Sequence, residues 1–215
     1  MTETPAPDRE AVVVAGHLGD LATVTAGLLA ADGGTRAAAL GGLVRLEALT
    51  ESALLAGFDD HDATVVRREI EVAAHQLIDL SSVNERLIAL VTGADADTAE
   101  VAAWALGERW EEHGDDSPPD PLCSRVLDAL EGAARTHNDA LVREAAVAAL
   151  GSVGAQRSVP VIINAASDKA TVRRRAVIAL APFEGPEVDA ALAAAINDRD
   201  WQVRQAAEDL ANPTS

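Results

Sequence analysis

Three segments near the C-terminus share one arrangement of apolar and polar positions. They are "DALVREAAVAAL" (139–150), "DKATVRRRAVIAL" (168–180) and "DRDWQVRQAAEDL" (198–210). Each has an Asp, then Val-Arg, then small residues, and ends on Leu. When the Val is numbered position 0, it falls at Val142, Val172 and Val203, which are 30 and 31 residues apart. The chain is therefore built from internal repeats.

The pattern continues toward the N-terminus with more drift. Position 0 is Thr35 in "DGGTRAAALGGLVRL" (32–46), Val66 in "DATVVRREIEVAAHQL" (62–77) and Thr98 in "DADTAEVAAWAL" (95–106). The successive intervals are 31, 32, 44, 30 and 31 residues. The long interval contains an insertion, "GERWEEHGDDSPPDP" (107–121).

Helical periodicity explains the pattern. At about 100° per residue, positions 0, 4, 7, 8 and 11 lie within one arc of a helix. Position 4 is occupied by Ala39, Ile70, Ala102, Ala146, Ala176 and Ala207, and position 8 by Leu43, Ala74, Leu106, Leu150, Leu180 and Ala211. We expect this arc to be buried, with small residues that let neighbouring helices approach closely. We call these segments the motif helices.

A first helix is expected before each motif helix, because Pro and Gly mark the joints between two apolar stretches. The expected first helices are 18–31, 50–58, 83–92, 121–136, 159–166 and 186–197. Two antiparallel helices per 30 residues make a helical-hairpin solenoid. The predicted fold is all-α: a right-handed α-α superhelix of about six hairpins. We expect residues 1–8 to form a disordered tail and 9–215 a single solenoid with the acidic insertion 107–121.

The pattern D-x-x-V-R-x-x-A-x-x-A-L resembles HEAT repeats, in the short form of the phycobilisome-lyase HEAT-like family. The resemblance covers about 30–211 and is strongest over 139–210. It implies an armadillo-like superhelix. It implies little about function, because such repeats serve many unrelated tasks.

The repeated Asp and Arg predict a structural ladder. The Asp precedes position 0 by three or four residues, where it can cap a helix, and the Arg at position 1 can reach the Asp of the next repeat. The ladder residues are Asp32, Arg36, Asp62, Arg67, Asp139, Arg143, Asp168, Arg173, Asp200 and Arg204. Residues that recur once per repeat are expected to serve the scaffold.

Positions 2, 6 and 9 of the motif helices should point away from the buried arc. Position 2 gives a charged row of Arg68, Glu100, Glu144 and Arg174, and position 6 an apolar row of Val72, Trp104, Ala148 and Ile178; His75 stands at position 9. An exposed apolar stripe flanked by charges suggests a groove for a protein segment around Trp104. The alternative is that neighbouring motif helices bury the stripe between them.

The insertion carries Trp110 among many carboxylates, so it is a second candidate for gripping a basic partner. The alternative is a solvated connection. Trp201, at the start of the last motif helix, is expected to be a terminal cap residue.

Composition narrows the function classes. The formal charge is −18, from 35 acidic and 17 basic residues, and aromatic residues make up 2%. Nucleic-acid binders need a basic footprint, so DNA and RNA are disfavoured and a basic protein partner is favoured. Residues 1–10 are acidic, and the apolar run 11–15 is too short for a signal core or a membrane span. We expect a cytoplasmic protein that binds no membrane; the sequence does not give its oligomeric state, for which a monomer is the default.

Candidate chemistry is sparse. The five histidines form no H-x-x-x-H motif and none is followed by Glu, and Cys123 is the single cysteine. The His-Glu pairs by which the HEAT-like deoxyhypusine hydroxylases bind iron are therefore absent. We expect no catalytic residue, metal or cofactor, and a non-enzymatic scaffold that binds an unidentified protein. The alternative is a HEAT-like enzyme component, bilin-lyase-like or metal-dependent-hydroxylase-like; nucleic-acid binding is less favoured.

Overall fold

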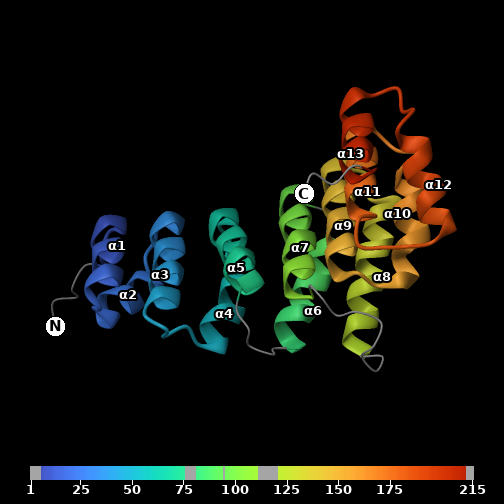
Figure 1. The fold of residues 1–215 in the computed structure, drawn as a ribbon. Coiled ribbons are helices and arrows are strands. Elements are labelled where there is room, and N and C mark those ends of the chain that lie inside the picture. The colour runs from blue at the N-terminus through green and yellow to red at the C-terminus, as the bar shows by residue number, and fades with distance from the viewer. Residues whose placement is uncertain (1–5, 76–80, 94, 111–120, 212–215) are drawn as a thin grey trace, which may run out of the picture. The chain divides into compact units, whose positions relative to one another are not determined.

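The computed structural model of the protein describes residues 6–75, 81–93, 95–110 and 121–211. These residues form thirteen α-helices and one short 3-10 helix, and no strand (Figure 1). The predicted all-α fold of stacked helical hairpins is confirmed. None of the described helices combines the length and the apolar character that a membrane crossing requires.

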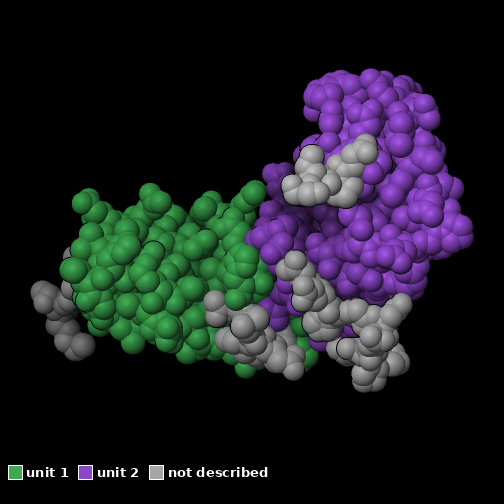
Figure 2. Space-filling model, viewed as in Figure 1, with its two compact units in different colours: residues 1–86 green, residues 87–215 purple. Residues whose placement is uncertain are grey.

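The chain divides into two compact units, residues 1–86 and 87–215 (Figure 2). Unit 1 contains α1 (Arg9–Leu18), α2 (Leu21–Gly27), α3 (Gly33–Arg45), α4 (Glu51–Gly57) and α5 (Ala63–His75), with the start of α6 (Ser81–Val91). Unit 2 contains the end of α6, then α7 (Ala96–Arg109), α8 (Pro121–Thr136), α9 (Ala140–Val153), the 3-10 turn Gln156–Ser158, α10 (Val159–Ala165), α11 (Ala170–Ala179), α12 (Pro186–Ala195) and α13 (Trp201–Ala211).

In unit 2 the motif helices α7, α9, α11 and α13 pack side by side in chain order, and the first helices α8, α10 and α12 pack against them. The alanines at position 4 and the leucines at position 8 of α7, α9 and α11 are buried. Burying Leu106, Leu150 and Leu180 contributes roughly 2 kcal/mol each. The periodicity of the sequence thus identifies the packed face of this unit.

Glycine and alanine set how closely these helices approach. A Cβ atom added to Gly107 on α7 would lie 2.8 Å from Ala149 Cα on α9, and one added to Gly151 would lie 2.8 Å from Ala179 Cα on α11. Both contacts are closer than real Cβ atoms allow. The backbones of neighbouring motif helices are therefore in near contact at these points.

Unit 1 begins with a helix that the repeat pattern does not predict. Asp8 caps α1 by accepting a hydrogen bond from the Ala11 amide at 2.8 Å, and Gly19 ends the helix in the left-handed region with φ 84°. The expected first helix 18–31 therefore begins only at Leu21. Val12 is fully buried and α1 packs against α3, as a motif helix does. Helix α1 lacks the Arg of the motif, so the sequence pattern misses it.

The register of α5 differs from the prediction by one residue. Val65, not Val66, is buried at position 0, so position 4 is Glu69 and position 7 is Val72. The two adjacent valines allow either register, and the Val-Arg pair selects the wrong one for position 0. Ile70 and Ala74, which were expected on the buried arc, are nevertheless buried. Val72, expected to be exposed, is 5% exposed and belongs to the core. Arg68 is partly exposed and His75 is exposed.

Candidate functional site

The Asp side chains of the repeat cap helices. Asp32 Oδ2 accepts from the Thr35 amide at 2.8 Å, and Asp139 Oδ1 accepts from the Leu141 amide at 2.8 Å. Asp62 and Asp200 accept from amides two residues later, at 2.9 Å each. Each caps an otherwise unsatisfied N–H group at a helix start, worth about 1 kcal/mol.

Arginines at position 1 connect successive repeats. Arg143 donates from Nε and Nη2 to Asp168 at 2.6 and 2.8 Å, and from Nη1 to the carbonyl of His137 at 2.7 Å. The hydrogen bonds from Arg143 hold the pKa of Asp168 below its usual value. A bidentate guanidinium–carboxylate pair of this kind fixes the orientation of one repeat on the next.

Two rungs of the predicted ladder use a different acceptor. Arg36 pairs with Asp60 rather than Asp62, and Arg173 pairs with Asp198 rather than Asp200, each with its closest contact at 2.7 Å. The pairing lowers the pKa of Asp60 and of Asp198 through the same hydrogen bonds. In each D-x-D turn the first carboxylate lies across from the Arg, while the second caps the following helix.

The other predicted rungs are absent from the described residues. Arg67 stands at position 2 in the observed register and lies 3.5 Å from Glu71 on its own helix. Ala99 takes the place of the Arg on α7 and is fully buried. Arg204 donates to the Asp198 carbonyl at 2.7 Å. The inter-repeat pairing therefore does not continue through these three positions.

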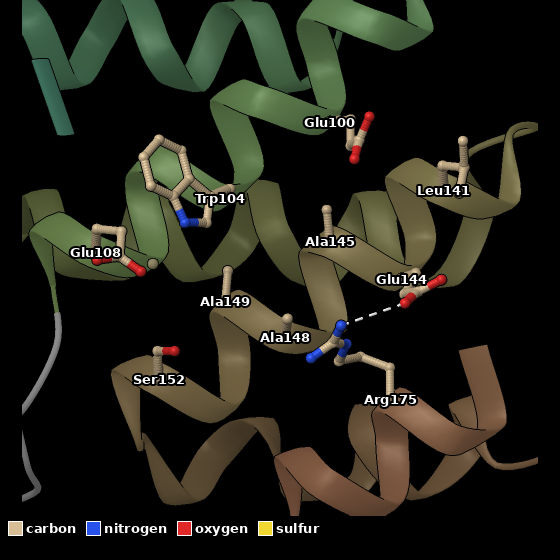
Figure 3. Close-up of a pocket in the computed structure, with 11 residues that line it drawn as sticks. Glu100, Trp104, Glu108, Leu141, Glu144, Ala145, Ala148, Ala149, Ser152 and Arg175 are labelled. Carbon is tan, nitrogen blue, oxygen red and sulfur yellow. Dashed lines mark hydrogen bonds and ion pairs between the residues drawn. The ribbon is translucent and has the colours of Figure 1, made fainter. Parts of the chain in front are cut away.

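A groove of about 390 Å³ lies on the motif-helix face of unit 2, between α7 and α9 (Figure 3). We call it the Trp104 groove. Its floor consists of small residues of the two closely packed helices. The lining residues are Glu100, Trp104, Gly107 and Glu108 from α7, Leu141, Glu144, Ala145, Ala148, Ala149 and Ser152 from α9, and Arg175 from α11.

The groove combines an aromatic wall with acidic rims. Trp104 is 36% exposed, and its indole stands beside the floor of alanines (Figure 3). Glu100 and Glu108 flank it on α7, and across the groove Glu144 lies 3.4 Å from Arg175. Glu144 is therefore paired with Arg175, and the carboxylates of Glu100 and Glu108 leave the groove with a net negative charge. This arrangement favours a cationic, partly apolar ligand, since indole and carboxylate both attract cations.

The structure distributes the predicted binding residues over several places. Glu100, Trp104 and Glu144 meet in the Trp104 groove, whereas Arg174 and Ile178 line a separate hollow near α13. The Trp110 side chain, expected to project from the acidic insertion, is 6% exposed because Trp110 ends α7 and packs into the core. Residues 111–120 of the insertion lie outside the described residues.

One buried group was not identified from the sequence. Glu69 on α5 is fully buried and packs against Gly57 of α4. Its two carboxylate oxygens have no hydrogen-bond partner among the residues that the structure describes. Burial raises the pKa of Glu69 to about 8. The sequence signals this packing only indirectly, through the glycine at position 57, because a Cβ atom there would collide with the Glu69 carboxylate. Within the described chain, no three His, Cys, Asp or Glu side chains are grouped so as to hold a metal ion.

A comparison with known protein families identifies the repeats. A family model described as HEAT repeats matches residues 83–181 and 127–211, which together span more than half of the chain. No curated protein matches the sequence.

Solved structures share the fold at low sequence identity. The X-ray structure of Escherichia coli YibA has a TM-score of 0.67 at 14% identity, covering 96% of this chain and 75% of that chain. A designed armadillo repeat protein in complex with the peptide (KR)4 has a TM-score of 0.60 at 15% identity, covering 89% and 98%. Kap95p, in its complex with RanGDP, has a TM-score of 0.58 at 15% identity, covering 88% of this chain and 29% of that chain. Such identities show the fold alone.

Proposed function

This chain belongs to the HEAT-repeat family, and from that premise we propose that it is a non-enzymatic scaffold that binds a basic segment of a partner protein. The site is the Trp104 groove on the motif-helix face of unit 2. The observation that carries the proposal is a half-exposed Trp beside a groove whose rims are carboxylates. Repeat solenoids present such extended surfaces to protein partners.

The shape of the groove supports an extended segment rather than a small molecule. It runs between two parallel-stacked helices and is floored by Ala145, Ala148 and Ala149, so a peptide backbone can approach closely. Trp104 offers an aromatic surface for a Lys or Arg side chain, worth roughly 0.5–2 kcal/mol. Glu100 and Glu108 then neutralise the charge. Among the fold relatives, the designed armadillo protein in complex with (KR)4 shows that a repeat stack of this kind accepts a basic peptide.

The net charge of −18 supports the same choice of partner. It accelerates encounter with a basic segment, and it disfavours DNA, RNA and anionic lipid. However, overall charge alone would attract any polycation. The test must therefore separate the groove from the general acidity of the protein.

Fluorescence anisotropy with a labelled (Lys-Arg)4 peptide at physiological salt makes that separation. A groove variant, Glu100→Gln with Glu108→Gln and Glu144→Gln, removes three charges at the site. A matched control, Glu184→Gln with Glu187→Gln and Asp189→Asn, removes three charges from exposed positions at and just before the start of α12. We expect the groove variant to bind at least tenfold more weakly, about 1.4 kcal/mol, and the control to bind as wild type within a factor of about three.

Trp104→Ala provides a second variant that leaves the charge unchanged. We expect it to weaken binding about tenfold while the unfolding midpoint stays close to wild type, because the side chain is 36% exposed. Equal losses in the groove variant and in its charge-matched control would contradict the proposal.

The enzyme-component alternative makes a different prediction. Iron or a coloured ligand would then remain bound to the purified protein and would be detected by elemental analysis or by absorbance.

A further inference from the structure

A second groove lies on the same face of unit 2, between α11 and α13. Its volume is about 360 Å³. The lining residues are Arg174 and Ile178 from α11, with Trp201, Gln202, Gln205, Ala206, Asp209 and Leu210 from α13. We call it the Trp201 groove. Trp201, for which the sequence predicts the role of a terminal cap residue, is 64% exposed and lines this hollow.

The Trp201 groove differs in chemistry from the Trp104 groove. Trp201, Ile178 and Leu210 give it an apolar lining, and both Trp201 and Ile178 are exposed. Asp209 accepts a hydrogen bond from Gln205 at 2.7 Å, which engages its carboxylate. Arg174 is exposed and forms no hydrogen bond or ion pair with any residue that the structure describes. The groove therefore suits a large apolar side chain with a carboxylate beside it.

The two grooves lie along one line of motif helices. The first lies between α7 and α9, and the second between α11 and α13, while α9 and α11 pack directly against each other. Neighbouring helices pack 8–10 Å apart, so two spacings separate the grooves by roughly 16–20 Å. An extended chain advances about 3.3 Å per residue, so about five or six residues span that distance.

We propose that the two grooves bind one extended segment of the partner. A basic cluster of that segment lies in the Trp104 groove. About five or six residues away, a large apolar residue next to an acidic residue or terminal carboxylate lies in the Trp201 groove. This inference rests on the proposed function, since it assigns the second half of the same ligand. The carboxylate pairs with Arg174 and the apolar side chain covers Trp201. Charge complementarity at both ends sets the direction of the segment.

Synthetic peptides test the inference. The full probe joins Lys-Arg-Lys-Arg through a five-residue Gly/Ser spacer to Leu-Asp. A second probe has a one-residue spacer, a third is the basic half alone, and a fourth is Leu-Asp behind the same spacer. Affinities are measured by fluorescence anisotropy at physiological salt. The variants are Trp201→Ala, Arg174→Gln and, as a control that loses the same charge at an exposed site outside the groove, Arg199→Gln.

We expect the full probe to bind wild type at least tenfold more tightly than the basic half, because the second contact is intramolecular. The one-residue spacer should abolish this gain. Trp201→Ala and Arg174→Gln should remove the gain without changing the affinity of the basic half, and Arg199→Gln should keep it.

Two failures are distinguishable. If the basic half does not bind wild type, the proposed function itself fails, and the fourth probe then tests the Trp201 groove alone. If the basic half binds but the full probe gains nothing at either spacer length, or if the gain survives Trp201→Ala, the two-groove inference is overturned while the proposed function stands.

Discussion

The burial of Glu69 predicts how the stability of the protein depends on pH, in both sign and size. Its carboxyl group is fully buried on α5, and neither oxygen has a hydrogen-bond partner within the described part of the chain. Burial raises its pKa from 4.5 to about 8. At neutral pH the folded protein therefore keeps Glu69 protonated, whereas the unfolded chain ionises it. The folded state binds one more proton than the unfolded state between these two pKa values.

The consequence is a loss of stability as the pH rises. Between pH 4.5 and 8 the free energy of unfolding should fall by about 1.4 kcal/mol per pH unit from this group alone. The full effect, reached above pH 8, is about 5 kcal/mol, and at pH 7 it is about 3 kcal/mol. The direction is opposite to that of Asp60, Asp168 and Asp198, whose lowered pKa values remove stability as the pH falls.

Glu69→Gln isolates the effect, because Gln has nearly the same shape and does not titrate. We expect the free energy of unfolding of the variant, relative to that of wild type, to rise steadily from pH 5 to pH 8. The difference should be about 3 kcal/mol larger at pH 7 than at pH 4.5. Glu184→Gln, at an exposed carboxylate, is the matched control and should follow the wild-type profile. Glu69→Met should gain further, since it removes the buried polar atoms as well.

The assay must report on unit 1. Trp104, Trp110 and Trp201 all lie in unit 2, so tryptophan fluorescence does not follow the region around Glu69. Urea unfolding followed by far-UV circular dichroism, combined with hydrogen exchange of α4 and α5 peptides, measures it directly. Parallel wild-type and Glu69→Gln profiles from pH 5 to 8 would refute the reasoning, because they would mean that Glu69 is ionised in the folded state.

Three further predictions test the scaffold of unit 2, where tryptophan fluorescence is a suitable readout of urea unfolding. Leu150→Ala should destabilise by about 2–5 kcal/mol, because the side chain is fully buried; a loss below 1 kcal/mol would place it outside the core. Arg143→Ala should lower the free energy of unfolding by about 2 kcal/mol, because its charged hydrogen bonds are lost. Arg174→Ala should lower it by less than about 0.5 kcal/mol. Equal losses would contradict a structural role for the ladder. Gly107→Ala should destabilise by about 1–3 kcal/mol, because its Cβ would meet Ala149. A Cβ on Gly132 meets nothing within 4 Å, so Gly132→Ala should stabilise by about 0.5–1 kcal/mol. Effects of the same sign would contradict the close helix approach.

Much of this fold is predictable because the repeat records the buried face. Small residues at position 4 and leucines at position 8 identify the packed arc of α7, α9 and α11 without any structure. The exposure of Trp104 follows from the same periodicity, since position 6 lies opposite the arc. Helical phase alone therefore points to the surface on which the Trp104 groove lies.

The sequence predictions that the structure corrects are wrong for specific physical reasons. In α5 the adjacent Val65 and Val66 both fit the motif, and the structure buries Val65, which places Glu69 in the core against Gly57. In the D-x-D turns the sequence cannot say which carboxylate meets the Arg, because that depends on where the turn lies across the repeat interface. Trp110 was assigned to the insertion from the repeat interval, although its helix continues to Arg109 and buries it.

The Trp201 groove shows a further limit. It depends on side chains from two helices and on Arg174 having no hydrogen-bond or ion-pair partner among the described residues. The spacing of residues along the chain shows neither property. The sequence supplies Arg174 and Ile178 as exposed candidates on α11. It does not show that α13 brings Trp201 and Leu210 beside them.

The central claim, that a basic segment binds in the Trp104 groove, is tested most directly by the three indole N–H signals in an NMR titration. The signals are assigned with single Trp→Phe variants, and the titrant is the short peptide Lys-Arg-Lys-Arg. We predict that the Trp104 signal shifts with saturation, whereas the signals of the buried Trp110 and of Trp201 stay in place. A peptide that binds while the Trp104 signal does not move, or that shifts all three signals alike, would contradict the account.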